Sequence, residues 1–318
     1  MKIEMRTGNS ALLAIVLLSW MALADAKPSR NGEEALLVVP ALTEGVAGPG
    51  KRVRVTPPEY VGTDVHYSLY LPANWRRDAH YPVIVEYTGN YYPASGSSGE
   101  VQDANLGYGL SAGKFIWVVL PFVSKDGKHN EISWWGDEAA TVAYCKRNVP
   151  RLCEEYGGDP ARVFLCGFSR GAIAVNYIGL YDDEIAKLWR GFITHDHYDG
   201  AKEWKGTTWG SPLDFYRQKA RERLQRLQGR SVLVMQKGSA EPIRRYLGAL
   251  TNVADFTFLD VPIDALFPVI PNKYIVHSHT DKWPLFDCEC ADRARTWLRE
   301  HAGPDKSGKN KNERELHE

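Results

Sequence analysis

The sequence predicts an α/β protein with a doubly wound, mostly parallel sheet, an antiparallel edge and helices on both faces. Short apolar runs rich in β-branched residues alternate with helical segments along most of the chain. One such run, residues 162–166, leads through a Gly-x-Ser-x-Gly motif directly into a helix. Parallel strands need long crossover connections, so this alternation favours a parallel sheet. No internal repeat is visible, and one domain is predicted.

The chain has 318 residues, of which 44% are hydrophobic and 25% charged, as in an ordinary globular protein. Lys and Arg together number 39, and so do Asp and Glu. This balance leaves no basic stripe that would attract a nucleic acid, so no nucleic-acid partner is expected.

The first 26 residues have the pattern of a signal peptide. Lys2 and Arg6 precede an apolar run at 11–24, and a small-x-small site ends at Ala26. We expect cleavage after Ala26, export to a periplasm or medium, and no stable membrane insertion afterwards. An uncleaved anchor helix is the alternative, although the run is short for a membrane span.

Three further regions are expected along the exported chain. Residues 27–50 are rich in Pro and Gly and predict a flexible N-terminal arm. The folded domain is expected at 51–302. Residues 303–318 are mostly charged and predict a disordered tail.

The strands of the domain are expected in two groups. Alternating patterns predict edge strands, and continuous apolar runs predict buried ones. The expected edge strands are 52–55 and 65–71, and the expected inner strands are 81–87, 115–120, 163–166, 191–194, 231–235 and 256–259. Helices are expected at 137–156, from Ser169 onward, and at 284–301. A helical insertion at 202–228 is expected to form a small cap over the site.

Five cysteines are too few for a disulfide scaffold. Cys145 and Cys153 could form one bridge if their helix breaks near Pro150. Cys288 and Cys290 on one helix would face different sides, which disfavours a metal pair there.

Ser169 is the candidate nucleophile. It stands between Gly167 and Gly171, after an apolar strand and before a helix. A serine on such a sharp strand-to-helix turn needs small residues two positions before and after it. The motif therefore predicts a nucleophile elbow with these two glycines as its necessary neighbours.

Candidate oxyanion donors follow the buried strand 81–87. Gly89 and Asn90 lie in the loop where one backbone N–H is expected, and the N–H of Arg170 follows the nucleophile. An ordinary turn at Gly89-Asn90 is the alternative.

The base is expected in the loop before the last helix, where two histidines compete. His279 is preferred because it is closer to that helix, and His277 is the alternative. Glu241, which follows strand 231–235, is the preferred carboxylate to orient the imidazole. Asp196, at the end of strand 191–194, is the alternative acid.

These residues carry a family resemblance. The chain from Val65 to Leu298 resembles α/β-hydrolases of the secreted esterase and polyhydroxybutyrate-depolymerase-like group, and the matching stretches are Tyr70-Leu71-Pro72, residues 81–85, residues 167–171, Gly238-x-x-Glu241-Pro242 and His279-Thr280-Asp281-x-Trp283. The resemblance implies that Ser169 is acylated. Two departures are the Thr88-Gly89 that replaces the usual His-Gly, and Glu241 in place of the usual Asp.

The resulting hypothesis is a secreted serine esterase that cleaves a carboxylic ester through an acyl-enzyme intermediate. A small-molecule or polymeric ester is the expected substrate, and no cofactor or metal is implied. One alternative is a metal-dependent hydrolase using His195, His197, His277 and His279, with Asp196 and Asp199 nearby. The other is a non-catalytic carbohydrate- or polymer-binding module on a hydrolase fold, lined by Tyr91, Tyr92, Trp134, Trp135, Trp204 and Trp209.

Overall fold

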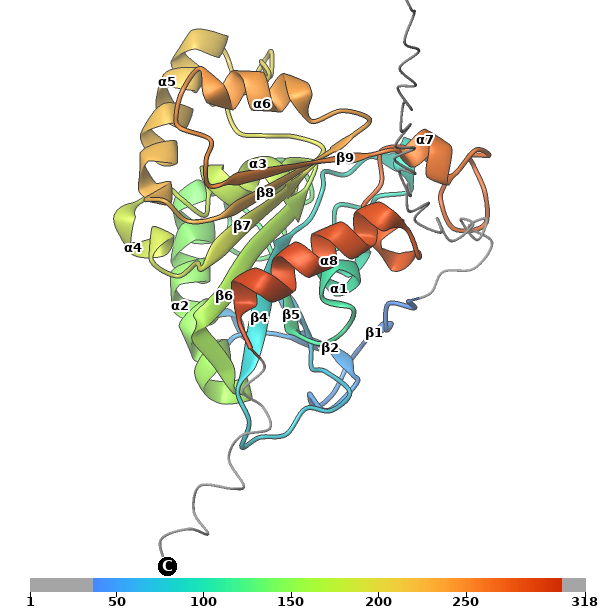
Figure 1. Cartoon of the computed structure of the whole chain (residues 1–318). Coiled ribbons are helices and arrows are strands. Elements are labelled where there is room, and N and C mark those ends of the chain that lie inside the picture. Colours follow the sequence, from blue (N-terminus) through green and yellow to red (C-terminus); the bar gives the residue numbers. More distant parts are fainter. Residues whose placement is uncertain (1–36, 305–318) are drawn as a thin grey trace, which may run out of the picture. The chain divides into compact units, whose positions relative to one another are not determined.

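A single mixed sheet forms the centre of the protein. The computed structural model describes residues 37–304, so the predicted signal peptide, the arm before residue 37 and the tail beyond residue 304 lie outside the described residues. Within that range the strand order is β1-β2-β3-β5-β4-β6-β7-β8-β9 (Figure 1). The strands are β1 (Leu42–Thr43), β2 (Arg52–Val55), β3 (Tyr67–Tyr70), β4 (Tyr81–Tyr87), β5 (Ile116–Leu120), β6 (Gly158–Phe168), β7 (Gly191–His195), β8 (Val232–Lys237) and β9 (Phe256–Val261).

The pairing confirms the predicted fold class. Strands β4 to β9 run parallel to one another, and β3 pairs antiparallel with both β2 and β5. The antiparallel part therefore lies toward one edge of the sheet. All parallel strands end at the same side, so the loops after β4, β6 and β7 lie near one another.

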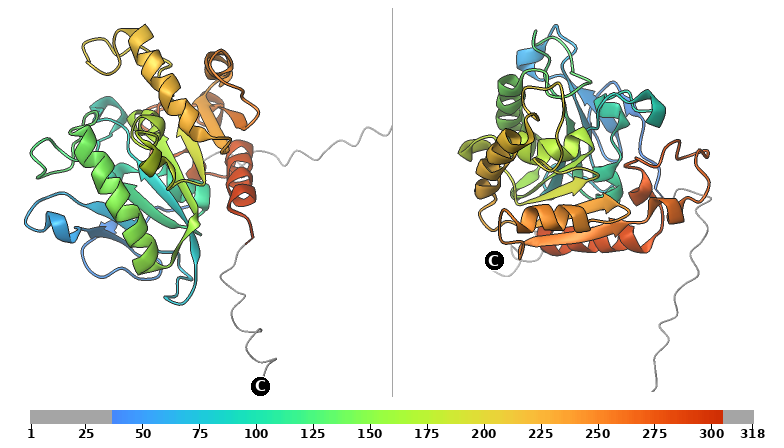
Figure 2. Two further views of the ribbon diagram at one scale, coloured as in Figure 1. Left: turned by 90° about the vertical axis from the view of Figure 1, so that its left-hand side faces the viewer. Right: turned by 90° about the horizontal axis from the view of Figure 1, so that it is seen from above.

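Helices cover both faces of the sheet (Figure 2). The bounds are α1 (Leu106–Ser111), α2 (Glu138–Tyr156), α3 (Arg170–Tyr177), α4 (Asp183–Ala186), α5 (Leu213–Leu224), α6 (Glu241–Gly248), α7 (Ile263–Leu266) and α8 (Glu289–Ala302). Buried side chains of α2, α3, α4 and α5 share one core, and those of α1, α7 and α8 share the other.

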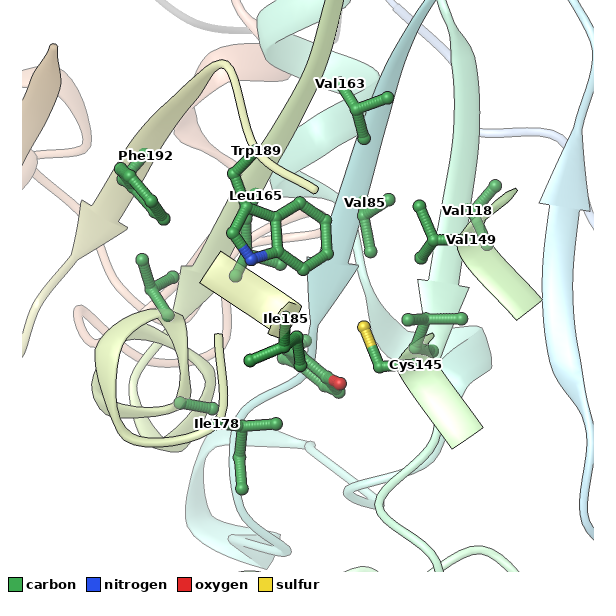
Figure 3. Packing of buried hydrophobic residues seen from close by; sticks show 14 of the residues in the cluster. Val85, Val118, Cys145, Val149, Val163, Leu165, Ile178, Ile185, Trp189 and Phe192 are labelled. Carbon is green, nitrogen blue, oxygen red and sulfur yellow. The ribbon is translucent and has the colours of Figure 1, made fainter. Parts of the chain in front are cut away.

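The alternation of side chains in β4 shows how the sheet divides these cores. Val83, Val85 and Tyr87 point into the core beneath α2 and α3, part of which Figure 3 shows. Ile84 points into the opposite core. Both sets are fully buried, which explains why β4 has a continuous apolar run rather than an alternating pattern.

Glu86 is the exception on that strand. Its carboxylate is buried and accepts hydrogen bonds from the N–H groups of Leu106 and Gly107 and from Nε1 of Trp117. These donors attach the first turn of α1 to the sheet, because a buried carboxylate without partners would be costly.

The N-terminal part of the domain differs from the prediction. Residues 37–50, expected in the flexible arm, are attached to the sheet: Leu42 and Thr43 form β1 beside β2, and the N–H of Leu37 bonds to Leu285 O. The strand is too short to leave a periodic pattern, so the folded domain begins earlier than expected.

Three other elements also differ in detail. Strand β6 begins at Gly158, five residues before the start predicted at residue 163. The final helix is divided, because residues 286–288 separate a short 3-10 turn, Trp283–Leu285, from α8. The helix α2 continues through Pro150, and Cys145 and Cys153 are both free thiols.

Among the described helices, none is long and apolar enough to cross a membrane.

Candidate active site

Ser169 lies on a strained turn between β6 and α3. Its backbone has φ 55° and ψ −117°, a conformation that non-glycine residues rarely adopt. Its N–H donates to the carbonyl of His195, the last residue of β7, at 3.0 Å. The turn therefore holds the serine at the carboxyl ends of two adjacent strands.

The two glycines of the motif are required by close backbone contacts. A Cβ on Gly167 would lie 2.2 Å from the carbonyl oxygen of Gly171, and one on Gly171 would lie 1.8 Å from the carbonyl oxygen of Tyr87. Both distances are far inside van der Waals contact. The small residues predicted from the motif thus allow α3 to approach β4 and β6 closely.

A continuous chain of hydrogen bonds leads away from the Ser169 hydroxyl. Nε2 of His279 lies 2.9 Å from Ser169 Oγ, and Nδ1 of the same ring lies 2.9 Å from Asp196 Oδ2. A carboxylate only accepts, so Nδ1 carries the proton and Nε2 is left to accept one from the hydroxyl. This arrangement can remove the proton from a serine hydroxyl as it attacks an electrophile.

Asp196 is held in place by the ends of two strands. Its N–H donates to Met235 O at 3.1 Å, and its Oδ1 accepts the N–H of Lys237 at 2.5 Å. Burial alone would raise the pKa of this carboxyl. The charges of His195 and His279 and the hydrogen bonds from His279 and Lys237 outweigh burial and hold the pKa below its ordinary value. Asp196 is therefore ionised beside His279.

The structure corrects the preference for Glu241 as the acid. Glu241 is the first residue of α6, its side chain is 55% exposed, and its oxygens lie 3.7 and 3.8 Å from Arg244 and Arg245. The carboxylate in contact with His279 is Asp196, the predicted alternative. Glu241 has the position of a helix N-terminal acid, which the helix dipole favours.

His277 lies beside the relay. Its Nδ1 accepts the backbone N–H of His279 at 3.0 Å, and its ring packs edge-on against Tyr92 at 5.6 Å. It thus supports the turn that presents His279, whereas the ring that reaches Ser169 is that of His279.

The loop after β4 lies against the serine turn. A Cβ on Gly89 would be 3.4 Å from the Cβ of Ser169. Within residues 37–304, the backbone N–H groups of Asn90 and Arg170 have no protein acceptor. The Asn90 side chain instead accepts the N–H of Trp134 at 2.7 Å. Both N–H groups are thus free to donate to an oxygen atom bound next to the Ser169 turn.

The Arg170 side chain is a feature that the sequence analysis missed. Its guanidinium is buried and donates to Glu131 O, Trp134 O, Gly99 O and Thr88 Oγ1. Burial lowers its pKa to about 9, while the charges of Glu131 and Glu100 act in the opposite direction. An Arg between Ser and Gly looks like an ordinary polar residue, so no sequence signal revealed that it joins the loops after β4 and β5.

Histidines and aromatic residues surround the relay. Nε2 of His195 lies 3.0 Å from Nε1 of Trp283 and 3.0 Å from Thr280 O, which connects β7 to the loop of His279. The ring of His197 lies 5.6 Å from that of His279 and 5.3 Å from Trp204.

The rings of four tryptophans pack together next to His197, with centroids 4.9–6.1 Å apart between contacting pairs; they are Trp134, Trp135, Trp204 and Trp209. Trp204 and Trp209 come from the insertion between β7 and β8, whose helix is confined to α5 and is shorter than predicted. Tyr91 and Tyr92 lie apart from this cluster, on the loop after β4, and are 51% and 43% exposed. The aromatic residues thus divide between a packed cluster and an exposed loop.

The histidines do not converge on a metal centre. Both ring nitrogens of His279 face Asp196 and Ser169, and Nδ1 of His277 accepts a backbone N–H. In the described part of the chain, no group of three or more His, Cys, Asp or Glu side chains is placed to hold a metal ion. The metal-dependent alternative therefore has no ligand set to support it. Asp199 instead forms a two-bond ion pair with Arg223.

Comparisons with known proteins find likeness only at the level of structure. No protein-family model matches the sequence, and no curated protein matches it significantly. A thermostable esterase is 16% identical, with a TM-score of 0.47, over 79% of this chain and 62% of that protein. An isopeptidase with a bound astexin is 14% identical, with a TM-score of 0.47, over 81% of this chain and 41% of that protein. The feruloyl esterase module of Clostridium thermocellum, complexed with sinapinate, is 10% identical, with a TM-score of 0.45, over 79% of this chain and 96% of that module.

The chain thus spans less than two thirds of the length of the first two of these proteins. The assignment of the fold rests on the topology of the chain itself. The strand order, the antiparallel β3 and the serine on a left-handed turn between β6 and α3 are its defining features. The protein has the fold of the α/β-hydrolase superfamily.

Proposed function

We propose that this protein is an exported serine esterase that cleaves a carboxylic ester through an acyl-enzyme intermediate. The observation that carries the proposal is the relay from Ser169 Oγ to His279 Nε2 and from His279 Nδ1 to Asp196, with both distances 2.9 Å. The nucleophile, the base and the orienting acid come from three different loops on the side of the sheet where the parallel strands end. Such a convergence is what acyl transfer needs.

The first half of the reaction forms the acyl-enzyme. His279 Nε2 takes the proton of Ser169 as Oγ attacks the ester carbonyl carbon. The negative charge that develops on the carbonyl oxygen is stabilised by the N–H groups of Asn90 and Arg170. The imidazolium is stabilised by Asp196, whose lowered pKa keeps it ionised. His279 then gives its proton to the departing alcohol, and the C–O bond of the ester breaks.

The second half releases the acid. A water molecule gives a proton to His279 Nε2 and attacks the acyl carbon, and the second tetrahedral species uses the same two N–H donors. Its collapse returns the proton from His279 to Ser169 Oγ and frees the carboxylic acid. No step needs a cofactor.

Export and substrate size belong to the same proposal. The signal-peptide pattern in residues 1–26 supports export. Exposed Tyr91 and Tyr92 follow the oxyanion residue Asn90 directly and offer aromatic faces to a small-molecule or polymeric ester. The complete relay favours this enzyme over a non-catalytic binding module, which needs no activated serine.

Replacement of Ser169 by Ala tests the proposal. We expect Ser169→Ala to lower kcat for a short-chain aryl ester by roughly three to six orders of magnitude, as the loss of a triad member does. A fluorophosphonate probe should label the wild-type protein at Ser169 and leave the variant unlabelled. Steady-state kinetics and peptide mapping measure the two effects.

Ser278→Ala is the matched control. Its hydroxyl contacts Lys237 Nζ in the loop next to His279 and does not contact Ser169. This variant should retain turnover within about threefold and keep the label, since it removes no group of the relay. Full activity in Ser169→Ala would refute the mechanism.

A further inference from the structure

A pair of thiols lies at the N-terminus of α8, on a different element from those that carry the relay. Sγ of Cys288 and Sγ of Cys290 are 3.0 Å apart. A continuous helix through both residues, as predicted, would place them on different faces. The structure brings them together because Cys288 is the N-cap residue with an extended backbone, φ −153° and ψ 155°, and only Cys290 is helical.

The separation of the two sulfur atoms is close to that of a bonded pair. A disulfide has an S–S distance of about 2.05 Å, so the two atoms need to approach by about 1 Å. Rotation about the Cα–Cβ bonds of two residues so near in sequence supplies this movement. The three other cysteines, Cys145, Cys153 and Cys166, are buried elsewhere in the fold and are free thiols.

The surroundings make the two thiols unequal. The Cys290 thiol is buried, with the residue 6% exposed, whereas Cys288 is partly exposed. A hydrogen bond from the Cys290 thiol lowers the pKa of Cys288, burial raises it, and the N–H of Ala291 and the charge of Arg295 lower it further. The pKa of Cys290 is raised, first by its bond to Cys288 and then by burial. Thiolate character and access both favour Cys288 as the attacking group.

We propose that Cys288 and Cys290 are a redox-active dithiol that a small-molecule disulfide oxidises to an intrachain disulfide. The thiolate of Cys288 attacks one sulfur of the small disulfide, which forms a mixed disulfide and releases one thiolate. Cys290 loses its proton and attacks the Cys288 sulfur, which closes the protein disulfide and releases the second thiolate. The two cysteines are oxidised, the small disulfide is reduced to two thiols, and the two cysteine protons end on those thiols.

The pair is separate from the proposed ester chemistry. Neither thiol contacts Ser169, His279 or Asp196, and no step of ester hydrolysis uses them. The dithiol can therefore be tested by its own readout, without an esterase assay.

Oxidised glutathione is the probe. Reduced wild-type protein in its exported form is incubated with oxidised glutathione. The remaining free thiols are blocked with an alkylating reagent, and the peptides are mapped by mass spectrometry. We expect the peptide that contains both cysteines to lose two hydrogens, with no glutathione retained and no dimer on a non-reducing gel. Reduction with a dithiol reagent should restore both free thiols.

Two variants separate the roles of the thiols. Cys290→Ser should retain one glutathione on Cys288, because the thiol that displaces it is missing. Cys288→Ser should gain glutathione on Cys290 much more slowly than the first variant gains it, because Cys290 is buried. Cys153→Ser is the matched control, since Cys153 is also 6% exposed, and it should oxidise as the wild type does.

Three results would overturn the proposal. In the first, both thiols of the wild-type protein stay free after incubation with oxidised glutathione. In the second, a glutathione adduct persists on wild-type Cys288. In the third, a disulfide forms between two chains. The alkylation measurement on wild-type protein needs no variant, so it remains decisive even where a variant fails to fold.

Discussion

Asp196 reaches His279 because of its own backbone conformation. Its φ of 67° lies in the left-handed region, which Asp and Asn tolerate better than most residues. The chain thus turns sharply at the end of β7. The carboxylate can then accept from Lys237 N–H with one oxygen and from His279 with the other. An unusual backbone conformation at such a position is consistent with a functional role.

Separate substitutions of Asp196 and Glu241 distinguish the two candidate acids. We expect Asp196→Asn to lower kcat by about 10⁴-fold, since an amide cannot fix the His279 tautomer or stabilise the imidazolium. Glu241→Gln should leave kcat within about twofold, because Glu241 is exposed and faces Arg244 and Arg245. Aryl-ester kinetics on the two variants measure both effects. The opposite ranking would restore Glu241 as the acid.

On the scale of the elements, local patterns predict the strands well, but they do not predict which loops face each other. The inner strands and the serine turn are set by local patterns, namely apolar runs and two glycines, so they were predicted nearly at their observed positions. The choice of acid depends on which loop faces His279. That is decided by the order of strands across the sheet and by the left-handed turn at Asp196, and neither leaves a periodic pattern.

The signal for Asp196 was present but could not be ranked. Asp196 and His197 directly follow β7, the neighbour of β6, after which Ser169 lies. Adjacent parallel strands place their following loops together. Without the pairing of β6 with β7, Glu241 after β8 had an equal claim. The N-cap conformation of Cys288 escaped prediction for a similar reason, because only tertiary packing divides the final helix.

Arg170 connects the start of α3 to two loops around the serine. Its guanidinium bonds to the loop after β4 through Thr88 and Gly99, and to the loop after β5 through Glu131 and Trp134. The backbone N–H of Trp134 in turn donates to the Asn90 side chain. The guanidinium therefore acts as a positioning group for the loop that presents the Asn90 N–H.

Replacement of Arg170 by Lys should separate positioning from stability. A lysine keeps a positive charge but cannot bridge the four acceptors on the two loops. We expect Arg170→Lys to lower kcat by about tenfold to a hundredfold with KM within about threefold, the pattern for weakened oxyanion stabilisation. Initial-rate kinetics over a range of substrate concentrations provide the two constants.

Arg295→Lys is the control for that experiment. Arg295 is also buried and donates to the backbone carbonyls of Gly109 and Pro284, but on the face of the sheet that α8 covers. This variant should unfold at a lower temperature and retain kcat. An equal loss of kcat in both variants would leave Arg170 with a general stability role only.

On the scale of the whole molecule, the site joins the two faces of the sheet. Ser169 is the N-cap residue of α3, whose buried side chains share a core with those of α2 and α5. His279 precedes the segment that packs with α1 and α8. His195 and Trp283 link the two sides through a buried contact at 3.0 Å. Protonation of His197, next to this junction, should therefore affect the stability of the entire domain.

His197 makes this dependence on pH testable. Burial lowers its pKa from 6.5 to about 4, and the charges of His279 and Lys202 act in the same direction. Between these two values the unfolded chain binds a proton that the folded chain does not. The free energy of unfolding should therefore fall as the pH falls through this window, by about 1–2 kcal/mol between about pH 7 and pH 5 from this group.

Urea denaturation of wild type and His197→Asn at the two pH values measures the effect. The variant should be less stable at neutral pH, because it loses the ring contact with Trp204, but its stability should decline less on acidification. His80→Asn, at an exposed position, should follow the wild-type decline. The lowered pKa of His66 acts in the same direction and is common to all three proteins, so it cancels in the comparison. An identical decline in wild type and His197→Asn would show that folding does not lower the pKa of His197.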